Sequence, residues 1–160
     1  MRQLNLMKKF TLITVADSWH HFEKPINEYE KRLQKELEIV LLKPARYDDM
    51  EACRQRDTKN VIETLKKYPH SYIVFCDLGG KSPGTTEQFS EWINTKSQQY
   101  KGIIFVIGGS YGLDLAMMKP VIHESISLGK WTLPHALANL IVIEQLYRVT
   151  NLLAGWKYHH

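Results

Sequence analysis

Two glycine-marked segments of the sequence could hold a ligand against the peptide backbone. CDLGGKSPGTT begins at Cys76 and VIGGSYGLD begins at Val106, and each closes a short apolar run. Glycines allow a ligand to approach bare backbone amides and permit unusual dihedral angles. The G-G-x-x-G of the second segment is neither the dinucleotide fingerprint nor a P-loop. Taken alone, each segment fits a plain turn between a strand and a helix at least as well.

A third segment, SISLGKWTLPHALANLIVIEQLYRV, begins at Ser125. Residues 125–128 are predicted to form a short strand, followed by the loop GKWTLP. A long helix is then predicted, with Thr132 as its cap and Pro134 in its first turn, where the missing N–H costs nothing. Gly155 is a natural end for this helix. The loop between strand and helix is therefore a third place for a ligand.

Histidines are the remaining side chains that could do chemistry. His135 stands at the predicted helix start, where the positive end of the helix dipole disfavours its protonation. The pairs His20–His21 and His159–His160 are adjacent in sequence, so their side chains do not face one site, and no metal site is predicted. H-E-x-x-H does not occur. The ending AGWKYHH fits a frayed tail, a remnant of a tag or a working part of the protein.

The elements that would position these segments alternate along the chain. Four apolar runs rich in β-branched and aromatic residues predict buried strands at 10–15, 37–42, 71–76 and 102–107. Helical spacing predicts helices around 23–36 and 61–68, and the capping box T-x-x-Q at Thr85 opens another. The polar stretch 45–60 is predicted to be a surface excursion before or within the second helix. This alternation predicts an α/β fold with a mainly parallel sheet between helices, whose ligand site lies at the carboxyl ends of the strands.

Composition bounds the class of protein. The 160 residues are predicted to form one domain, 1–160, with a net charge of +4 and a sequence pI of about 9.0. The positive charge fits either a polyanionic partner or a few extra surface lysines. Cys53 and Cys76 predict no disulfide framework or zinc site, and a reducing cytoplasm fits. The apolar stretch after the N-terminus is too short for a signal sequence or a membrane span.

Four pieces together resemble one enzyme family: DLGGKSPGTT, FVIGGSYGL, SISLGKWTLPHALANLIVIEQLYRV and the terminal YHH. They are similar to the large-subunit ribosomal RNA pseudouridine N3-methyltransferases, the RlmH (YbeA) family of the SPOUT superfamily. The resemblance implies S-adenosylmethionine as methyl donor and N3 of a pseudouridine in 23S ribosomal RNA as acceptor. It also implies a C-terminal deep trefoil knot, a cytoplasmic homodimer whose active sites are completed by the partner chain, and no metal or membrane.

The resemblance assigns roles to residues. His159 is the implied base or orienting group, and Tyr158 would stack on the target base or hydrogen-bond to it. The RNA contacts expected from charge are basic side chains: Lys81, His135, Arg148, Lys157 and His160. Lys130 is also expected to meet a phosphate. The implied donor-binding residues lie in three loops: Cys76, Asp77 and Leu78; Gly108, Gly109 and Gly112; and Leu128, Gly129, Lys130, Trp131, Thr132, Leu133 and Pro134.

The chain departs from the family pattern in four places. Asn139 replaces an arginine, Asp57–Thr58 replaces Glu-Gly, Lys157 replaces a proline, and His160 is the basic residue that follows His159. These changes affect residues expected to contact the RNA. They leave open the alternative of a knotted module that binds nucleotide or RNA without transferring a methyl group. An α/β domain whose glycines are only turns is the third alternative. Arg148 also has a second reading, since it could pair with Glu144 four residues earlier.

Overall fold

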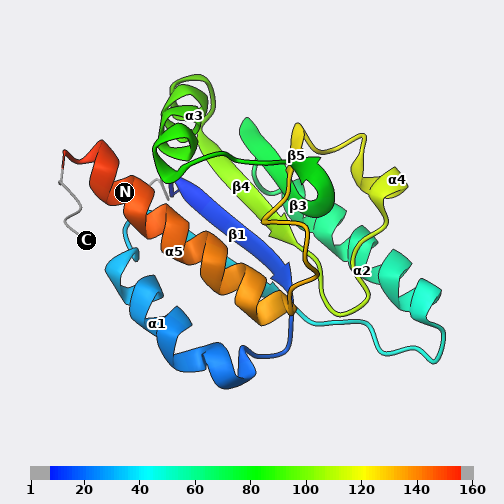
Figure 1. Cartoon of the computed structure of the whole chain (residues 1–160). Helices are drawn as coiled ribbons and strands as arrows, with labels where there is room; N and C mark the ends of the chain where they lie inside the picture. The colour runs from blue at the N-terminus through cyan, green and yellow to red at the C-terminus, as the bar shows by residue number, and fades with distance from the viewer. Residues whose placement is uncertain (1–7, 156–160) are drawn as a thin grey trace, which may run out of the picture.

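The computed structural model describes residues 8–155 and contains one five-stranded, all-parallel sheet of order β2-β1-β4-β3-β5 (Figure 1). The strands are β1 (Phe10–Val15), β2 (Leu37–Leu42), β3 (Ser71–Lys81), β4 (Gly102–Ile107) and β5 (Glu124–Ile126). The helical segments are η1 (His20–Phe22), α1 (Glu23–Arg32), α2 (Met50–Leu65), α3 (Thr86–Gln99), α4 (Leu115–Met118) and α5 (His135–Leu153).

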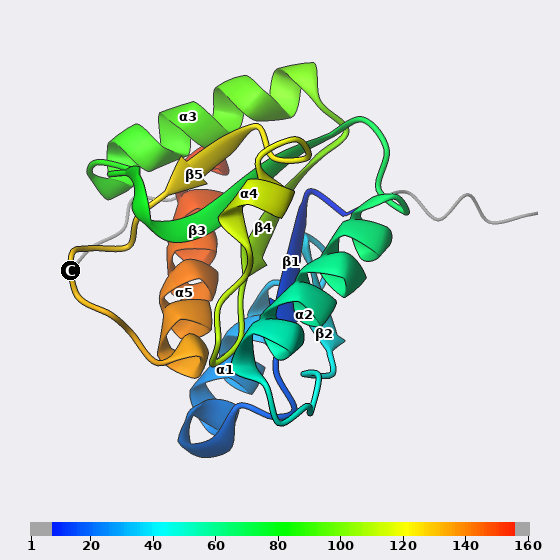
Figure 2. The same ribbon diagram turned by 90° about the vertical axis from the view of Figure 1, so that its right-hand side faces the viewer.

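Helices cover both faces of the sheet, with α1, α3 and α5 on one side and α2 and α4 on the other (Figures 1 and 2). The side chains of the central strands alternate between these layers. Leu12 and Phe105 pack into the core beneath α5, whereas Ile13 and Val106 pack into the core beneath α2. All four are buried. Burial on both faces explains why these strands read as continuous apolar runs, and the α/β class with a parallel sheet is confirmed.

The predicted first loop is largely strand. β3 continues past Cys76 to Lys81, because β5 pairs with it on both sides of a register shift: Ile126 is the partner of Cys76 and again of Lys81. The apolar pattern ends at Cys76 and therefore hid the polar, glycine-containing half of this strand. β5 itself occupies Glu124–Ile126 rather than 125–128.

The polar stretch 45–60 enters the second helix at Met50, one of the two predicted placements, but the predicted surface location is wrong for three of its residues. α2 begins there, capped by the Asp49 carboxylate, and Cys53, Asp57 and Thr58 are buried. The Asp57 carboxylate accepts a hydrogen bond from the Ala45 amide at 2.7 Å. Burial raises the pKa of this carboxyl group, although the hydrogen bond acts in the opposite direction. These polar side chains are buried because the fold supplies them with partners.

Several helix boundaries differ from the predictions. The helix expected over 23–36 ends at Arg32, so that Leu37 can start β2. Thr132 does not cap α5: Pro134 occupies the N-cap position, and no side chain makes a capping hydrogen bond. The capping box of Thr85 and Gln88 is confirmed at α3, and Gly155, at φ +80°, follows the end of α5. None of the helices among residues 8–155 is long and apolar enough to cross a membrane.

Candidate functional site

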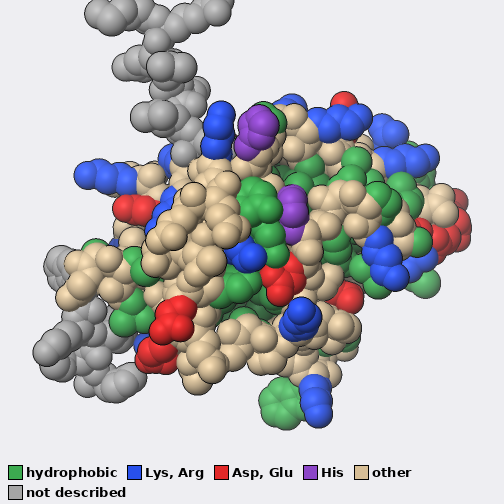
Figure 3. Space-filling model, turned by 90° about the horizontal axis from the view of Figure 1, so that it is seen from above, with side chains coloured by type: hydrophobic (Ala, Val, Ile, Leu, Met, Phe, Trp, Pro, Cys, Tyr) green, Lys and Arg blue, Asp and Glu red, His purple; other side chains and the backbone are tan. Residues whose placement is uncertain are grey.

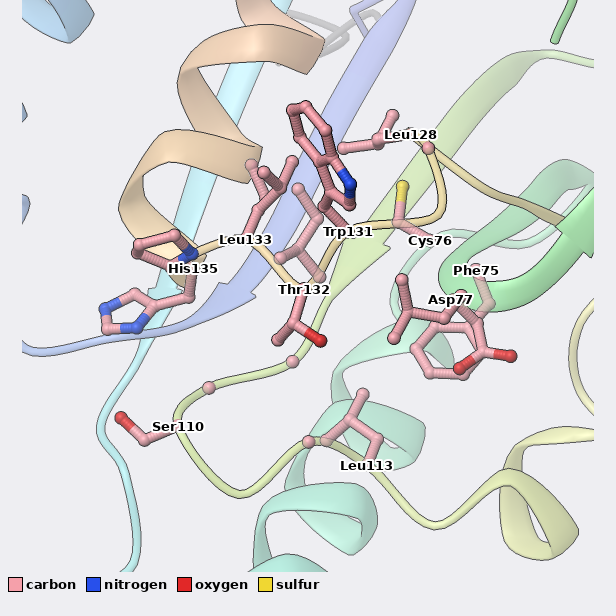
Figure 4. Close-up of a pocket in the computed structure, with 18 residues that line it drawn as sticks. Phe75, Cys76, Asp77, Ser110, Leu113, Leu128, Trp131, Thr132, Leu133 and His135 are labelled. Carbon is pink, nitrogen blue, oxygen red and sulfur yellow. The ribbon is translucent and has the colours of Figure 1, made fainter. Parts of the chain in front are cut away.

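A cavity of about 710 Å³ opens beside the middle of β3 and the carboxyl ends of β4 and β5 (Figure 4). This volume lies within the range of small-molecule sites. These strand segments, the loops that follow β4 and β5 and the start of α5 supply its walls: Phe75, Cys76, Asp77, Leu78, Ile107, Gly108, Gly109, Ser110, Gly112, Leu113, Leu128, Gly129, Trp131, Thr132, Leu133, Pro134, His135 and Ala138. Segments about 20–50 residues apart in the chain thus meet at one edge of the sheet, as expected for a parallel α/β fold.

The glycines after β4 are required by the backbone. A Cβ atom on Gly109 would lie 2.9 Å from the Val15 carbonyl oxygen, at the end of the neighbouring strand β1. Gly112 adopts φ +68°, in the left-handed region that side chains disfavour. The loop after β4 can therefore pack closely against β1 and turn sharply before α4. Its backbone then faces the cavity.

The loop from Ser127 to Pro134, hereafter the third loop, is tied to the end of β3. The Ser127 amide donates to the Lys81 carbonyl at 2.8 Å. The Ser127 hydroxyl donates to the Gly129 carbonyl at 2.7 Å and accepts from the Gly129 amide at 3.2 Å. Gly129 has φ +141°, which suits glycine. These bonds fix the start of the loop before it crosses the cavity.

The cavity wall is mixed in chemistry. Burial raises the pKa of the Cys76 thiol to about 12, so this side chain is protonated near neutral pH and serves as apolar wall rather than as a nucleophile. The Asp77 carboxylate accepts from the Gly79 amide at 3.1 Å and is the acidic side chain among those labelled around the cavity (Figure 4). Apolar side chains, one carboxylate and exposed loop backbone together suit a ligand with both a flat ring and polar groups.

His135 lies at the cavity wall and favours its neutral form. Burial lowers the pKa of its imidazole, and a positive charge on nearby His20 lowers it further. His20 has φ +49°, and the Ser18 hydroxyl lies 3.2 Å from its Nδ1 atom. Neutral His135 can both donate and accept a hydrogen bond.

This shift predicts a pH dependence of stability that His135 helps to set. Because the folded state holds His135 below the ordinary histidine pKa of 6.5, the unfolded chain binds the proton more readily. The free energy of unfolding should therefore decline as the pH falls below about 6.5 and be restored above it. Urea titrations at pH 7.5 and 5.5 measure this loss, and His135→Gln should reduce it. An equal loss in both proteins would contradict the assignment.

The structure separates the predicted RNA-contacting residues. His135 lines the cavity, whereas Lys81 lies at the end of β3 beside a smaller hollow of about 320 Å³. The Arg148 side chain forms an ion pair with Glu144, two turns or more along α5 from the cavity. Lys157, Tyr158, His159 and His160 lie outside the described residues.

The predicted donor-binding residues meet at the cavity, with one exception. Every one of them lines it except Lys130, which is exposed on the third loop. The resemblance did not point to Phe75, Ile107, Ser110, Leu113 and Ala138, which also line it. Their positions in the sequence, next to predicted loop residues, were the signal that could have identified them as cavity residues.

Two of the departures from the family pattern are structural. Asn139 is fully buried and donates through Nδ2 to the Thr14 hydroxyl at 3.0 Å and the His135 carbonyl at 2.7 Å. The Thr58 hydroxyl accepts from the Asp114 amide at 2.9 Å and donates to the Arg54 carbonyl at 2.7 Å. Thr58 thereby ties α2 to the loop after β4.

Charge outside the cavity is mixed. Basic and acidic side chains are interspersed over the face seen from above in Figure 3. Among residues 8–155, no group of three His, Cys, Asp or Glu side chains is arranged to hold a metal ion. The cavity is therefore the feature that points most directly to a ligand.

The sequence and the fold are similar to those of known methyltransferases. A family model described as "Predicted SPOUT methyltransferase" matches residues 8–159. The protein named "Ribosomal RNA large subunit methyltransferase H" from Gloeobacter violaceus is 34% identical, over 87% of this chain and 89% of its own length. The protein of the same name from Phocaeicola vulgatus is 32% identical, over 95% of this chain and 99% of its own. The A. aeolicus TrmH/SpoU tRNA modifying enzyme has a similar fold, with a TM-score of 0.54, 12% identity and coverage of 92% of this chain and 78% of its own.

Proposed function

Because the chain belongs to the SPOUT methyltransferase family, we propose that it is an S-adenosylmethionine-dependent methyltransferase acting on N3 of a pseudouridine in 23S ribosomal RNA. The observation that carries the proposal is the convergence of three separate chain segments on one cavity. Its relatives named as large-subunit ribosomal RNA methyltransferases supply the RNA substrate class. A cytoplasmic location follows from this substrate.

The residues of the cavity fit the proposed donor. The apolar side chains of Leu113, Leu128 and Leu133 would contact the adenine, and loop backbone would hydrogen-bond to its polar edge. Asp77 offers a carboxylate to a hydroxyl or ammonium group of the donor. When bound, S-adenosylmethionine supplies an electrophilic methyl group on its sulfonium. The neutral thiol of Cys76 does not compete for that methyl group.

A trefoil knot is part of this proposal. We infer that the chain from β5 to α5 passes through the loop formed by the preceding segments, as in the family. The close approach of Gly80 to the Ile126 backbone supports tight packing of these segments. Knotted chains are rare exceptions among folds, so this inference rests on the family and not on the strand pattern.

Chain geometry supports a homodimer whose sites are shared. α5 has 19 residues and starts at the cavity, so its far end lies about 28 Å away. A terminus that continued in the direction of α5 would lead away from the cavity of its own chain, which supports the family arrangement in which the terminal residues act at the cavity of a second copy. If His159 takes part in transfer, we infer that it acts there.

The proposed chemistry requires N3 of the pseudouridine to lose its proton before it attacks the methyl group. A histidine has a pKa suited to accepting that proton near neutral pH. His159 of the partner subunit is the proposed base or orienting group, and Tyr158 of the partner subunit would hold the target base by stacking or hydrogen bonding. Neutral His135 of the cavity wall and the basic side chains of Arg148, Lys157 and His160 would contact the nucleotide or its phosphates.

Transfer of labelled methyl groups to large ribosomal subunits tests this function. Subunits from cells that lack the protein should accept label from S-adenosylmethionine, and mass spectrometry should locate it on N3 of one pseudouridine. His159→Ala and Tyr158→Ala are each expected to lower kcat by about 100-fold or more, in the range of general acid–base contributions. Donor affinity, measured by calorimetry, should change less than twofold.

Two results would contradict the proposal. Normal turnover in both variants would remove the roles of Tyr158 and His159. Binding of subunits without any transfer by the unaltered protein would favour a knotted RNA-binding module, the alternative raised by Asn139. The burial of Asn139 against Thr14 argues that this substitution changes the core rather than the RNA surface.

A further inference from the structure

Trp131 presents its indole ring to solvent from the third loop. Its exposed fraction is 84%, the largest among the large hydrophobic side chains of the described residues, and Met50 follows at 64%. A large aromatic side chain is normally buried or partnered, since it carries much apolar surface. Although Trp131 borders the cavity, most of its side chain faces solvent.

The loop holds Trp131 in this position through fixed neighbours. The Ser127 hydroxyl bonds to both the amide and the carbonyl of Gly129, and the Ser127 amide bonds to the end of β3. On the C-terminal side of Trp131, the ring of Pro134 restricts the backbone dihedral φ. A ring displayed from a constrained loop loses little conformational entropy when a partner covers it.

The charge around Trp131 favours a polyanion. Lys130 is its exposed neighbour, and no Asp or Glu occurs from residue 125 to residue 143. The core of a protein–protein interface is depleted of lysine, so this pair is poorly suited to contact with a second copy of the chain. An aromatic ring beside a lysine is the combination that binds single-stranded nucleic acid, by stacking on a base and by neutralising a phosphate.

We propose that Trp131 stacks on an unpaired base of ribosomal RNA next to the target nucleotide, while Lys130 contacts the phosphate backbone. This inference rests on the proposed function, because the cavity bordered by the loop then holds the methyl donor. Unpaired bases are the usual targets of RNA-binding proteins, and stacking tolerates any base. The backbone of the third loop thus serves the donor, and its Trp131 side chain serves the RNA.

Binding of purified large ribosomal subunits to variants of the full chain tests the assignment. Trp131→Ala should weaken subunit affinity roughly tenfold, raising KM with little change in kcat. Trp131→Phe should retain most of the affinity, because it keeps a ring. Lys130→Gln should lower the slope of log affinity against log salt by about one. Met50→Ala is the matched control, since Met50 is exposed and lies outside the cavity.

Parallel measurements separate the competing explanations. Because Trp131 borders the donor cavity, affinity for S-adenosylmethionine is measured for every variant and should fall by a smaller factor than subunit affinity. Sedimentation should show an unchanged oligomeric state. A loss of donor affinity as large as the loss of subunit affinity, or dissociation to monomers, in Trp131→Ala would overturn the proposal, as would an effect no larger than that of Met50→Ala. Failure of the unaltered protein to methylate subunits would instead refute the proposed function, whatever Trp131 does.

Discussion

Gly80→Ala is expected to weaken S-adenosylmethionine binding by at least about 100-fold and to lower the free energy of unfolding by about 1–3 kcal/mol. A Cβ atom on Gly80 would lie 2.5 Å from the Ile126 carbonyl carbon and 2.6 Å from the Ile126 nitrogen. These are backbone atoms of β5, so no side-chain rotation relieves the contact. β3 and β5 must separate, and the third loop, anchored through Ser127 to Lys81, must move with β5. Calorimetry with the donor and urea unfolding measure the two effects.

Gly79→Ala is the matched control for this prediction. A Cβ atom there would have the Asp77 carboxylate oxygen as its nearest neighbour, at 3.2 Å, and that side chain can rotate. We therefore expect donor affinity within about fivefold of the unaltered protein, a loss of less than roughly 1 kcal/mol. Equal donor affinity in the Gly80 and Gly79 variants would show that the β3–β5 contact does not position the donor loops.

Mixing two inactive variants is expected to restore methyl transfer. One variant lacks residues 158–160, and the other carries Gly80→Ala with an intact terminus. Each variant alone should show no measurable methyl transfer. The first lacks Tyr158 and His159, and the second does not bind the methyl donor. After exchange at equal amounts, half of the dimers should be mixed and should contain one complete site, so activity should recover to about a quarter of that of the unaltered protein.

The recovery depends on the proposed arrangement, in which the terminal residues of one chain serve the cavity of its partner. The deletion variant should bind S-adenosylmethionine normally, which shows that its defect is confined to transfer. Gly112→Val replaces Gly80→Ala if the latter does not fold, because Gly112 needs φ +68° but has open space around it. Absence of recovery, with mixed dimers demonstrated by gel filtration of tagged chains, would exclude a shared site.

The sheet was predictable because its strands read as apolar runs, and the central strands β1 and β4 are buried on both faces. The runs at 10–15, 37–42 and 102–107 match the observed strands residue for residue, since a strand covered by helices needs apolar side chains on each side. The second half of β3 was not predictable in this way. Its residues Asp77–Lys81 are held by pairing with β5 across a register shift, and such pairing depends on distant backbone rather than on local composition.

The start of α2 shows a second limit. Asp57 and Thr58 are polar, so the sequence pattern places them at the surface, yet both are buried with partners from other parts of the chain. Hydrogen bonds across such separations are invisible to local periodicity. The same limit applies to the cavity: its glycines could be located from the sequence, but their convergence required the sheet order, and the roles of Tyr158 and His159 still rest on the family resemblance.

The length of α5 has a consequence for how this protein can change over evolutionary time. The helix starts at one cavity, and its other end leads to the terminus that is proposed to serve the cavity of the partner chain. Its length therefore sets the spacing between the two sites. Inserting one residue would lengthen it by about 1.5 Å and rotate everything beyond by about 100°. Substitutions within α5 are compatible with such a device, but insertions and deletions are not. Functional descendants should therefore vary α5 in composition while keeping its 19 residues.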